Sequence, residues 1–218
     1  MAAFDFGDKF DPQLFDQQLN ASVTVNTQDY VRLGWEMFKE HIGEFVGFTL
    51  IIFVGSALSS SLHAPGSLIF SAIAASFYAG YSIVAFMLLR GKPFQFGDFF
   101  RGFNYFLPLF LASLAGSLLV SIGLVLLIFP GIYLAVGYMF ATFLVIDYRM
   151  DFWSAMEISR KIITRHWFSF FGFALVLCAL NFFGLLLFGV GLLVTIPVSA
   201  CAAAIAYKEI IGLHSTEW

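Results

Sequence analysis

Three long uncharged runs, separated by short polar segments, dominate the pattern of hydrophobic and polar positions. The runs cover Phe45–Leu89, Gly102–Ile146 and His166–Tyr207, and none of them contains an Asp, Glu, Lys or Arg residue. Each run is 42 to 45 residues long, whereas a helix needs about 20 apolar residues to cross a hydrocarbon core about 30 Å thick. Each run therefore predicts two transmembrane helices.

Each uncharged run contains a local break near its middle, at Ala64-Pro65-Gly66, Phe129-Pro130-Gly131 or Gly189-Val190-Gly191. Proline cannot continue a helix from the preceding turn, and glycine accepts the backbone angles of a tight turn. We therefore predict an all-α polytopic membrane protein whose six transmembrane helices form three hairpins. The predicted spans are approximately residues 45–62, 68–89, 105–128, 132–146, 167–187 and 192–207.

The polar segment before the first span predicts an amphipathic helix at Thr27–Glu40. Val31, Trp35 and Phe38 recur at helical spacing, and charged residues occupy the positions between them. This pattern is typical of a helix that lies at the membrane interface. A second and shorter interfacial segment is expected at Gly97–Arg101.

The polar segment Arg149–Arg165 predicts another interfacial helix. Ser154 and Glu157 have the spacing of a capping box, in which a serine hydroxyl and a glutamate satisfy backbone N–H groups at the helix start. Its basic side chains can then face lipid headgroups. The expected apolar face consists of Phe152, Met156, Ile158, Ile162 and Ile163.

With six crossings, every polar segment falls on the same side of the membrane. All 11 Lys and Arg residues and all 14 Asp and Glu residues belong to these segments or to the adjoining span ends. The opposite turns carry no formal charge, only His63. Because short cytoplasmic loops concentrate Lys and Arg, we expect both termini to be cytoplasmic.

The composition favours the same class of protein. The chain of 218 residues is 60% hydrophobic and 11% charged, whereas soluble domains carry about 25% charged residues. With no long basic patch, nucleic acid is not an expected partner. The acidic amino terminus lacks the basic start of a signal peptide. We divide the chain into an acidic Phe-rich cytoplasmic tail (1–27), a membrane domain (28–211) and a short cytoplasmic tail (212–218).

The amino-terminal tail contains four phenylalanines in an acidic setting. Two interpretations remain open. Because it can bury so little apolar area, the tail can be disordered. Alternatively, its phenylalanines dock into a partner or onto the protein's own cytoplasmic face. The residues expected to dock are Phe4, Phe6, Phe10 and Phe15.

The interiors of the predicted spans contain no Asp, Glu, Lys or Arg residue, and Glu44 and Asp147 stand at span ends, where we expect them near headgroups. Ion-coupled transport usually needs an ionisable group within the membrane. We interpret Asn181 as forming a hydrogen bond between helices rather than contacting a substrate. If the protein instead carries a neutral or lipid-like solute, the expected contacts are Tyr138, Thr142, Asn181 and Thr195.

Small residues four positions apart predict close helix packing, within one chain or between copies. The expected packing pairs are Gly43 and Gly47, Ala112 and Gly116, and Ala200 and Ala204. The two cysteines, Cys178 and Cys201, also fall inside spans. We interpret them as small apolar fillers, although their similar depth leaves a contact between them possible.

Sequence motifs for catalysis are absent: there is no HExxH, no GxSxG and no phosphate-binding loop. An enzyme acting on lipid would need an acid–base pair or a set of metal ligands, and the sequence suggests neither. We therefore expect no catalytic, cofactor-binding or metal-binding residue and no enzyme activity.

The segment Ile128–Leu134 resembles the "PG-I-x-L" turn of a family of bacterial integral membrane proteins. Ala155, Ser159, Ile163 and Trp167 are similar to that family's "A-x-x-x-S-x-x-L-x-x-x-x-W" segment, with isoleucine in place of the usual leucine.

The resemblance continues at Gly191–Pro197 and Tyr207 and covers about Tyr30 to Ile211. A related membrane module is fused to some glycerophosphodiester phosphodiesterases. We expect no catalytic domain of that kind here, so the activity does not carry over. The resemblance implies a multi-pass protein of the bacterial inner membrane.

Together these observations predict a non-enzymatic scaffold or accessory subunit of a larger membrane complex. It would bind anionic lipid and a protein partner on its cytoplasmic face, or form a homo-oligomer. The alternative is a channel or carrier for a neutral or lipid-like solute. The basic residues expected to contact lipid phosphates are Lys39, Arg90, Lys92, Arg101, Arg160, Lys161 and Arg165.

Overall fold

The computed structural model describes residues 24–61 and 63–215, and within them it contains helices and turns but no β-strand. Six helical segments are long and apolar enough to cross a membrane. The protein is therefore an all-α polytopic membrane protein, as the sequence predicts. The phenylalanines expected to dock a partner, Phe4, Phe6, Phe10 and Phe15, lie outside the described residues.

The first polar helix has the bounds that the sequence predicts. It is α2, Thr27–Glu40, and the side chain of its N-cap residue Asn26 accepts a hydrogen bond from the backbone N–H of Asp29. Its buried face differs from the expected one: Tyr30, Gly34 and Phe38 are buried, whereas Trp35 is 43% exposed. The stripe that packs inward is thus rotated by about one residue.

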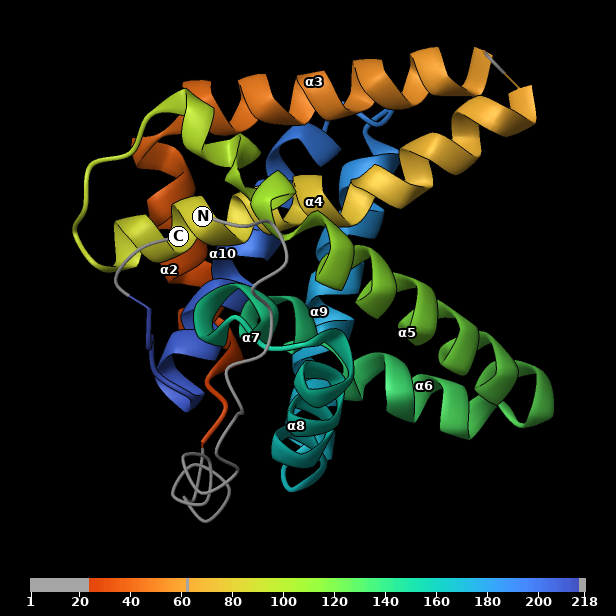
Figure 1. The fold of residues 1–218 in the computed structure, drawn as a ribbon. Helices are drawn as coiled ribbons and strands as arrows, with labels where there is room; N and C mark the ends of the chain where they lie inside the picture. Colours follow the sequence, from red (N-terminus) through yellow and green to blue (C-terminus); the bar gives the residue numbers. More distant parts are fainter. Residues whose placement is uncertain (1–23, 62, 216–218) are drawn as a thin grey trace. The chain divides into compact units, whose positions relative to one another are not determined.

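The first hairpin consists of α3, Ile42–Ser61, and α4, His63–Leu89 (Figure 1). The sequence predicts a turn that continues through Pro65 and Gly66, but both residues already belong to the first turn of α4. Proline is tolerated there because the first backbone N–H groups of a helix have no acceptor within the helix. The proline therefore marks the start of the returning helix rather than the loop.

The second hairpin repeats this arrangement. A 3₁₀ helix, η2, spans Phe96–Tyr105 and is followed by α5, Phe106–Leu126, and α6, Ile128–Gly137. The turn is at Leu127, so Pro130 again lies in the first turn of the returning helix. The helix ends approach closely here, because a Cβ atom added to Gly123 would lie 2.8 Å from the backbone nitrogen of Gly131.

The fourth span is broken. After α6 ends at Gly137, residues 138–140 form a turn, and α7 spans Ala141–Tyr148. The sequence predicts one continuous helix over residues 132–146, and that prediction is wrong at this turn. The two helices together still form a segment long enough to cross a membrane, Ile128–Tyr148.

The last part of the chain follows the prediction closely. It contains α8, Phe152–Thr164, α9, Trp167–Leu186, and α10, Leu192–Ile210. The break before α10 includes Gly189 at φ +77°, a conformation that favours glycine. Pro197 lies inside α10, as expected.

The chain divides into two compact units, which we describe separately. One combines Asn26–Phe106 with Leu175–Ala206. Its core is aromatic: the rings of Phe48 and Phe99 stack at a centroid distance of 4.5 Å, and Tyr81 meets Phe48 edge-on at 5.0 Å. These contacts attach η2 to α3 and α4.

The other unit combines Leu107–Ala174 with the segment that begins at Tyr207. Its central ring is Phe140, which is fully buried. Phe140 meets Phe170 edge-on at 5.5 Å and Tyr207 at 5.7 Å. The residue at the break of the fourth span is therefore also a core residue.

Candidate functional site

The polar helix α8 begins at a cap that differs from the expected one. The carboxylate of Asp151 accepts hydrogen bonds from the backbone N–H groups of Trp153 and Ser154, both at 3.0 Å. The predicted capping box of Ser154 with Glu157 is therefore wrong. An Asp immediately before an apolar periodic segment is a known start signal, and it could have located this cap.

The inner face of α8 is anchored to the broken span through Ser159, which is fully buried. Its hydroxyl donates to the carbonyl of Gly137 at 2.6 Å and accepts from the backbone N–H of Phe140 at 3.1 Å. These two backbone groups flank the break, where the regular helical bonds are interrupted. A side chain from α8 thus satisfies polar groups that would otherwise be costly in an apolar environment.

The apolar face of α8 is only partly the expected one. Met156, Ile162 and Ile163 are buried as predicted, while Phe152 and Ile158 are half-buried. Ala155 and Ser159 complete the buried face. The prediction considered only large apolar residues, and it therefore missed these two small residues among the five that are buried.

The opposite side of α8 carries a network of charges. The guanidinium of Arg160 donates to both carboxylate oxygens of Glu157, at 3.0 and 2.8 Å, and to the hydroxyl of Tyr133 at 3.5 Å. Lys161 lies 3.5 Å from the same carboxylate. The hydrogen bond from Arg160 holds the pKa of Glu157 below its usual value, and the same bond raises the pKa of Arg160.

The polar helix α2 is attached to the last span by a glycine. A Cβ atom added to Gly34 would lie 2.8 Å from the backbone nitrogen of Ala202 and 3.0 Å from the carbonyl of Val198. Backbone therefore contacts backbone where α2 crosses α10. The sequence analysis did not select Gly34, because its packing partner lies far away in the chain.

A three-residue ion-pair network covers the polar side of α2. Arg32 donates to Asp29 at 3.1 Å and to Glu36 at 3.2 Å, and all three side chains are about half exposed. The hydrogen bond with Asp29 raises the pKa of Arg32. The amide of Asn26 also donates to Asp29. The network carries two negative charges and one positive charge.

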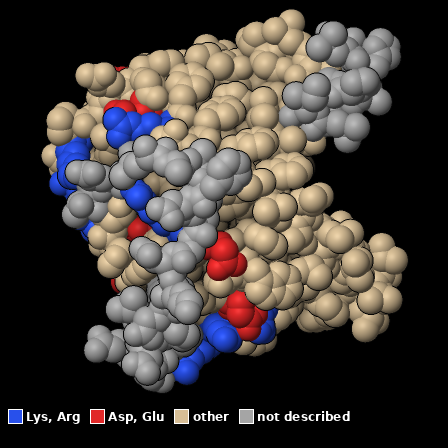
Figure 2. Space-filling view, in the orientation of Figure 1, with Lys and Arg blue, Asp and Glu red and all other residues tan. Residues whose placement is uncertain are grey.

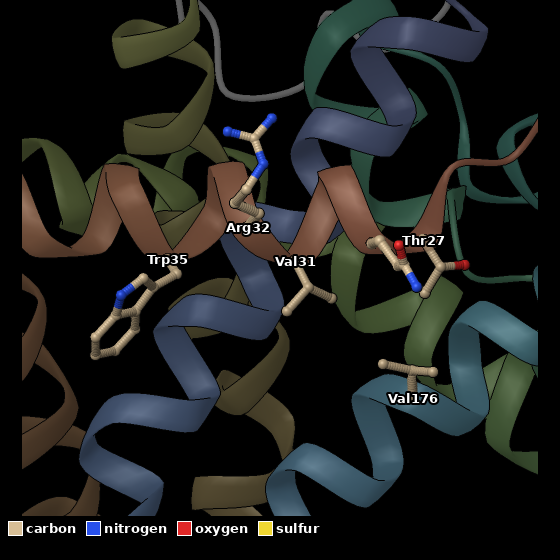
Figure 3. Close-up of a pocket in the computed structure, with 6 residues that line it drawn as sticks. Thr27, Val31, Arg32, Trp35 and Val176 are labelled. Atoms are coloured by element: carbon tan, nitrogen blue, oxygen red, sulfur yellow. The ribbon is translucent and has the colours of Figure 1, made fainter.

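A groove runs beside this network and has a volume of about 460 Å³. Figure 3 shows Thr27, Val31, Arg32 and Trp35 along α2, with Val31 and Trp35 on the side of Val176 of α9 and the guanidinium of Arg32 pointing away from Val176. Gln28 completes the lining, and the accessible wall is almost wholly apolar. The α2 residues form one stripe of the helix, next to the face that packs on α10.

Asp147, at the end of the fourth span, is deeply buried in the protein, with 1% of its surface exposed. It accepts a hydrogen bond from the Tyr207 hydroxyl at 3.0 Å. The backbone N–H groups of His214 and Ser215 donate to it at 2.9 and 2.8 Å. The carboxylate thus fastens the chain after α10 to the end of α7, and the ring of His214 stacks on Tyr148 at 4.7 Å.

The basic residues expected to bind lipid differ in their surroundings. Lys39, Arg101, Lys161 and Arg165 are exposed, while Arg90, Lys92 and Arg160 are half-buried. Arg101 is paired with Asp98 at 2.7 Å. In Figure 2, blue and red atoms lie next to one another in several places on the face shown, and most of that surface is uncharged. Their contact with lipid stays a prediction.

The expected solute contacts belong to both compact units. Tyr138 lies in the turn of the fourth span and Thr142 on α7, and both are half-buried. The amide of Asn181 donates to the Ser199 hydroxyl at 2.8 Å, so the predicted hydrogen bond between helices is confirmed. The remaining Asn181 oxygen and the hydroxyl of Thr195 are buried and have no hydrogen-bond partner among the described residues.

Of the expected packing residues, Ala112 lies in a small core with Ala141 and Met156. A Cβ atom added to Gly116 would lie 3.8 Å from the Met156 methyl group. A Cβ atom added to Gly47 would lie 3.6 Å from the ring of Phe96, whereas one added to Gly43 would meet nothing within 4 Å. The other predicted pair lies on α10, where Ala204 is buried and Ala200 is half-buried.

The cysteines differ in exposure, since Cys201 is buried and Cys178 is exposed, and neither forms a disulfide. Within the described residues, no three His, Cys, Asp or Glu side chains are arranged to hold a metal ion. The family models, curated proteins and solved structures that were compared give no match to this chain. The motif resemblance to a bacterial membrane family therefore stays a prediction.

Proposed function

We propose that this protein is a non-enzymatic scaffold or accessory subunit of a membrane complex. Its polar helices would present a fixed surface to lipid headgroups and to a partner protein. The location that fits best is a bacterial inner membrane, with both termini in the cytoplasm. The motif resemblance and the confinement of charge to one set of segments support this location.

The observation that carries the proposal is the attachment of α8. Its inner face is buried and is hydrogen-bonded through Ser159 to both sides of the broken span. The outward face is therefore held in one orientation. A surface fixed in this way loses little conformational entropy when a partner binds, which favours a docking role.

The outward face of α8 has the composition of a contact surface. Trp153 is 58% exposed, and Glu157 and Lys161 follow it at four-residue spacing with side chains that are 37% and 55% exposed. Exposed tryptophan is characteristic of protein interfaces and of the headgroup region of membranes. Basic residues on this side can add about 1 kcal/mol each near an anionic lipid surface.

A photo-reactive amino acid at position 153 tests the docking claim in living cells. We expect a discrete crosslinked protein band that weakens when Lys161→Glu is added. The matched control is the same probe at Leu118 on α5, which is 59% exposed on an apolar surface. If the probe at position 153 gives no more protein adduct than the probe at Leu118, the scaffold role of α8 is wrong.

The acidic tail is proposed to strengthen the same contact through Phe4, Phe6, Phe10 and Phe15. Deletion of residues 2–23 should then reduce the yield of the position-153 adduct. An unchanged yield would show that the tail does not contribute to this contact, and it would not affect the docking role proposed for α8.

A carrier for a neutral or lipid-like solute is the second candidate. The supporting observation is the pair of buried oxygen atoms, on Asn181 and Thr195, that have no hydrogen-bond partner among the residues described. A passing solute with hydrogen-bond donors could satisfy them. Vesicles reconstituted with the protein would then show solute flux or lipid scrambling above empty controls, and Asn181→Leu would reduce it. Flux equal to that of empty vesicles excludes this candidate.

A further inference from the structure

The groove between α2 and α9 is lined by residues of the first compact unit. On one side, α2 is fixed to α10 by the contact of Gly34 with the backbone of Val198 and Ala202. The stripe that lines the groove lies beside this contact and ends at Trp35. Its volume of about 460 Å³ is within the range of about 300–1,000 Å³ that is typical of ligand sites in proteins.

The far wall of the groove belongs to α9, a helix that is long and apolar enough to cross a membrane. Val176 follows Trp167, the first residue of α9, by nine positions, which at 1.5 Å per residue places it about 14 Å along the helix. Val31 and Trp35 provide further apolar wall on α2. A hydrocarbon chain is therefore the occupant that the wall suits best.

Charged side chains of α2 lie beside the groove. Arg32 lies between Asp29 and Glu36, and only two of its guanidinium nitrogens are engaged with these carboxylates. A lipid phosphate can approach Arg32, which has five N–H donors. Because two carboxylates lie nearby, the headgroup also needs a positive charge. An ethanolamine ammonium can donate hydrogen bonds to Asp29 or Glu36, whereas a choline ammonium has no N–H and a glycerol headgroup has no positive charge.

We propose that this groove is a binding site for one phospholipid with an ethanolamine headgroup. An acyl chain lies along Val31, Trp35 and Val176, the phosphate contacts Arg32, and the ammonium contacts Asp29 or Glu36. The site is separate from the basic residues that are proposed above to contact anionic lipid. It does not depend on the docking role of α8.

Trp35 is 43% exposed and lines the groove, so its fluorescence can be used to detect a bound lipid. The full-length protein is placed in phosphatidylcholine nanodiscs that contain brominated phosphatidylethanolamine, phosphatidylglycerol or phosphatidylcholine at the same mole fraction. The quenching of Trp35 alone is obtained by subtracting the quenching measured for Trp35→Phe from that measured for the natural chain. We expect brominated phosphatidylethanolamine to bind about fivefold more strongly than the other two, as expected for one additional charged contact of about 1 kcal/mol.

Two variants separate the acyl-chain contact from the headgroup contact. Val176→Phe fills the groove and should remove the preference for phosphatidylethanolamine, whereas Val54→Phe, at an exposed position of α3, should not. Glu36→Gln should reduce the preference and leave the general level of quenching unchanged. Equal quenching by the three lipids, which indicates unselective lipid contact, overturns the proposal. So does a preference for phosphatidylglycerol, or an absence of quenching, which would indicate that another part of the chain or a second copy fills the groove.

Discussion

At the scale of single residues, the packing of η2 on α4 depends on two positions that have no side chain. A Cβ atom added to Gly80 of α4 would lie 2.0 Å from the carbonyl oxygen of Phe99, and one added to Gly102 would lie 2.1 Å from that of Ser76. Because these neighbours are backbone atoms, they cannot rotate away. The two glycines therefore set how closely η2 packs on α4.

Gly80→Ala should destabilise the protein by about 1–3 kcal/mol, the usual cost of forcing extra volume into a packed contact. Gly172→Ala on α9 is the matched control, because its new methyl group would meet nothing within 4 Å. Alanine favours a helix over glycine by up to about 1 kcal/mol, so the control should be neutral or stabilising. Thermal unfolding in detergent checks both, and equal shifts for the two variants would contradict the contact.

Glu157 makes the stability contributed by the polar helix α8 depend on pH. The pKa of Glu157 is lowered in the folded protein, mainly by its hydrogen bond with Arg160. The ionised carboxylate therefore stabilises the fold above its unfolded pKa of about 4.3, and this contribution is lost as the pH falls through the folded value. Since Glu157 is partly exposed, the effect is modest, within about 1 kcal/mol.

Glu157→Gln should consequently lower the midpoint of thermal unfolding at pH 7 and make little difference well below pH 4.3. Glu36→Gln on α2 serves as a comparison for a carboxylate that pairs with a different arginine, Arg32. A loss of stability for Glu157→Gln that is the same at low and neutral pH would show that the charge of Glu157 is not its cause.

At the scale of elements, the fourth span illustrates how a membrane protein tolerates irregular backbone. Non-helical backbone within a bilayer requires partners from the protein itself. Here Ser159 of α8 reaches the carbonyl of Gly137 and the N–H of Phe140 on the two sides of the turn. The polar helix α8 is therefore part of the membrane domain and not a loosely attached surface element.

Ser159→Ala should leave two buried backbone groups without partners, at a cost of about 1–3 kcal/mol for each. Hydrogen exchange of the Phe140 amide should become faster, and the protein should unfold at a lower temperature. Ser113→Ala is a suitable control, because that hydroxyl is exposed and bonds only to its own helix, at the Phe110 carbonyl. Unchanged exchange at Phe140 would mean that another group replaces the serine.

At the scale of the whole molecule, the main feature is the distribution of charged residues along the chain. Polar segments that carry all formal charges alternate with turns that carry none. If six spans cross the membrane, the turns at Ser61 and at Leu187–Gly191 emerge on one side, and α2 and α8 lie on the other. This arrangement predicts that one face of the protein hardly extends beyond the headgroups.

Cysteine labelling tests this topology in a chain in which Cys178 and Cys201 have been replaced by alanine. A cysteine at Ser61 should react with a membrane-impermeant reagent in intact cells, and a cysteine at Ser154 should react only after permeabilisation. The unsubstituted cysteine-free chain controls for background. Labelling of both positions from the outside would contradict the odd number of crossings, three, that this topology places between them.

Much of the fold follows from the sequence alone. Hydrophobicity is a local property, and a bilayer sets a minimum length for each uncharged helix, so the spans and the bounds of α2 are predictable within a few residues. Phe129-Pro130-Gly131 correctly indicated a hairpin, but the position of the turn was wrong because proline is accepted in the first turn of the following helix. The caps and the buried faces were less predictable.

The sequence by itself determined that this is a helical, multi-pass membrane protein with its charges restricted to alternate connecting segments. Only the tertiary structure decided that the fourth span breaks, that Ser159 bonds across this break, and that Asp147 holds the chain after α10. It also decided that a groove forms beside α2. The physical reason is that the transfer of apolar residues into lipid depends only on the composition of each segment. Hydrogen bonds and glycine contacts depend instead on which residues, distant in the sequence, come together in the fold.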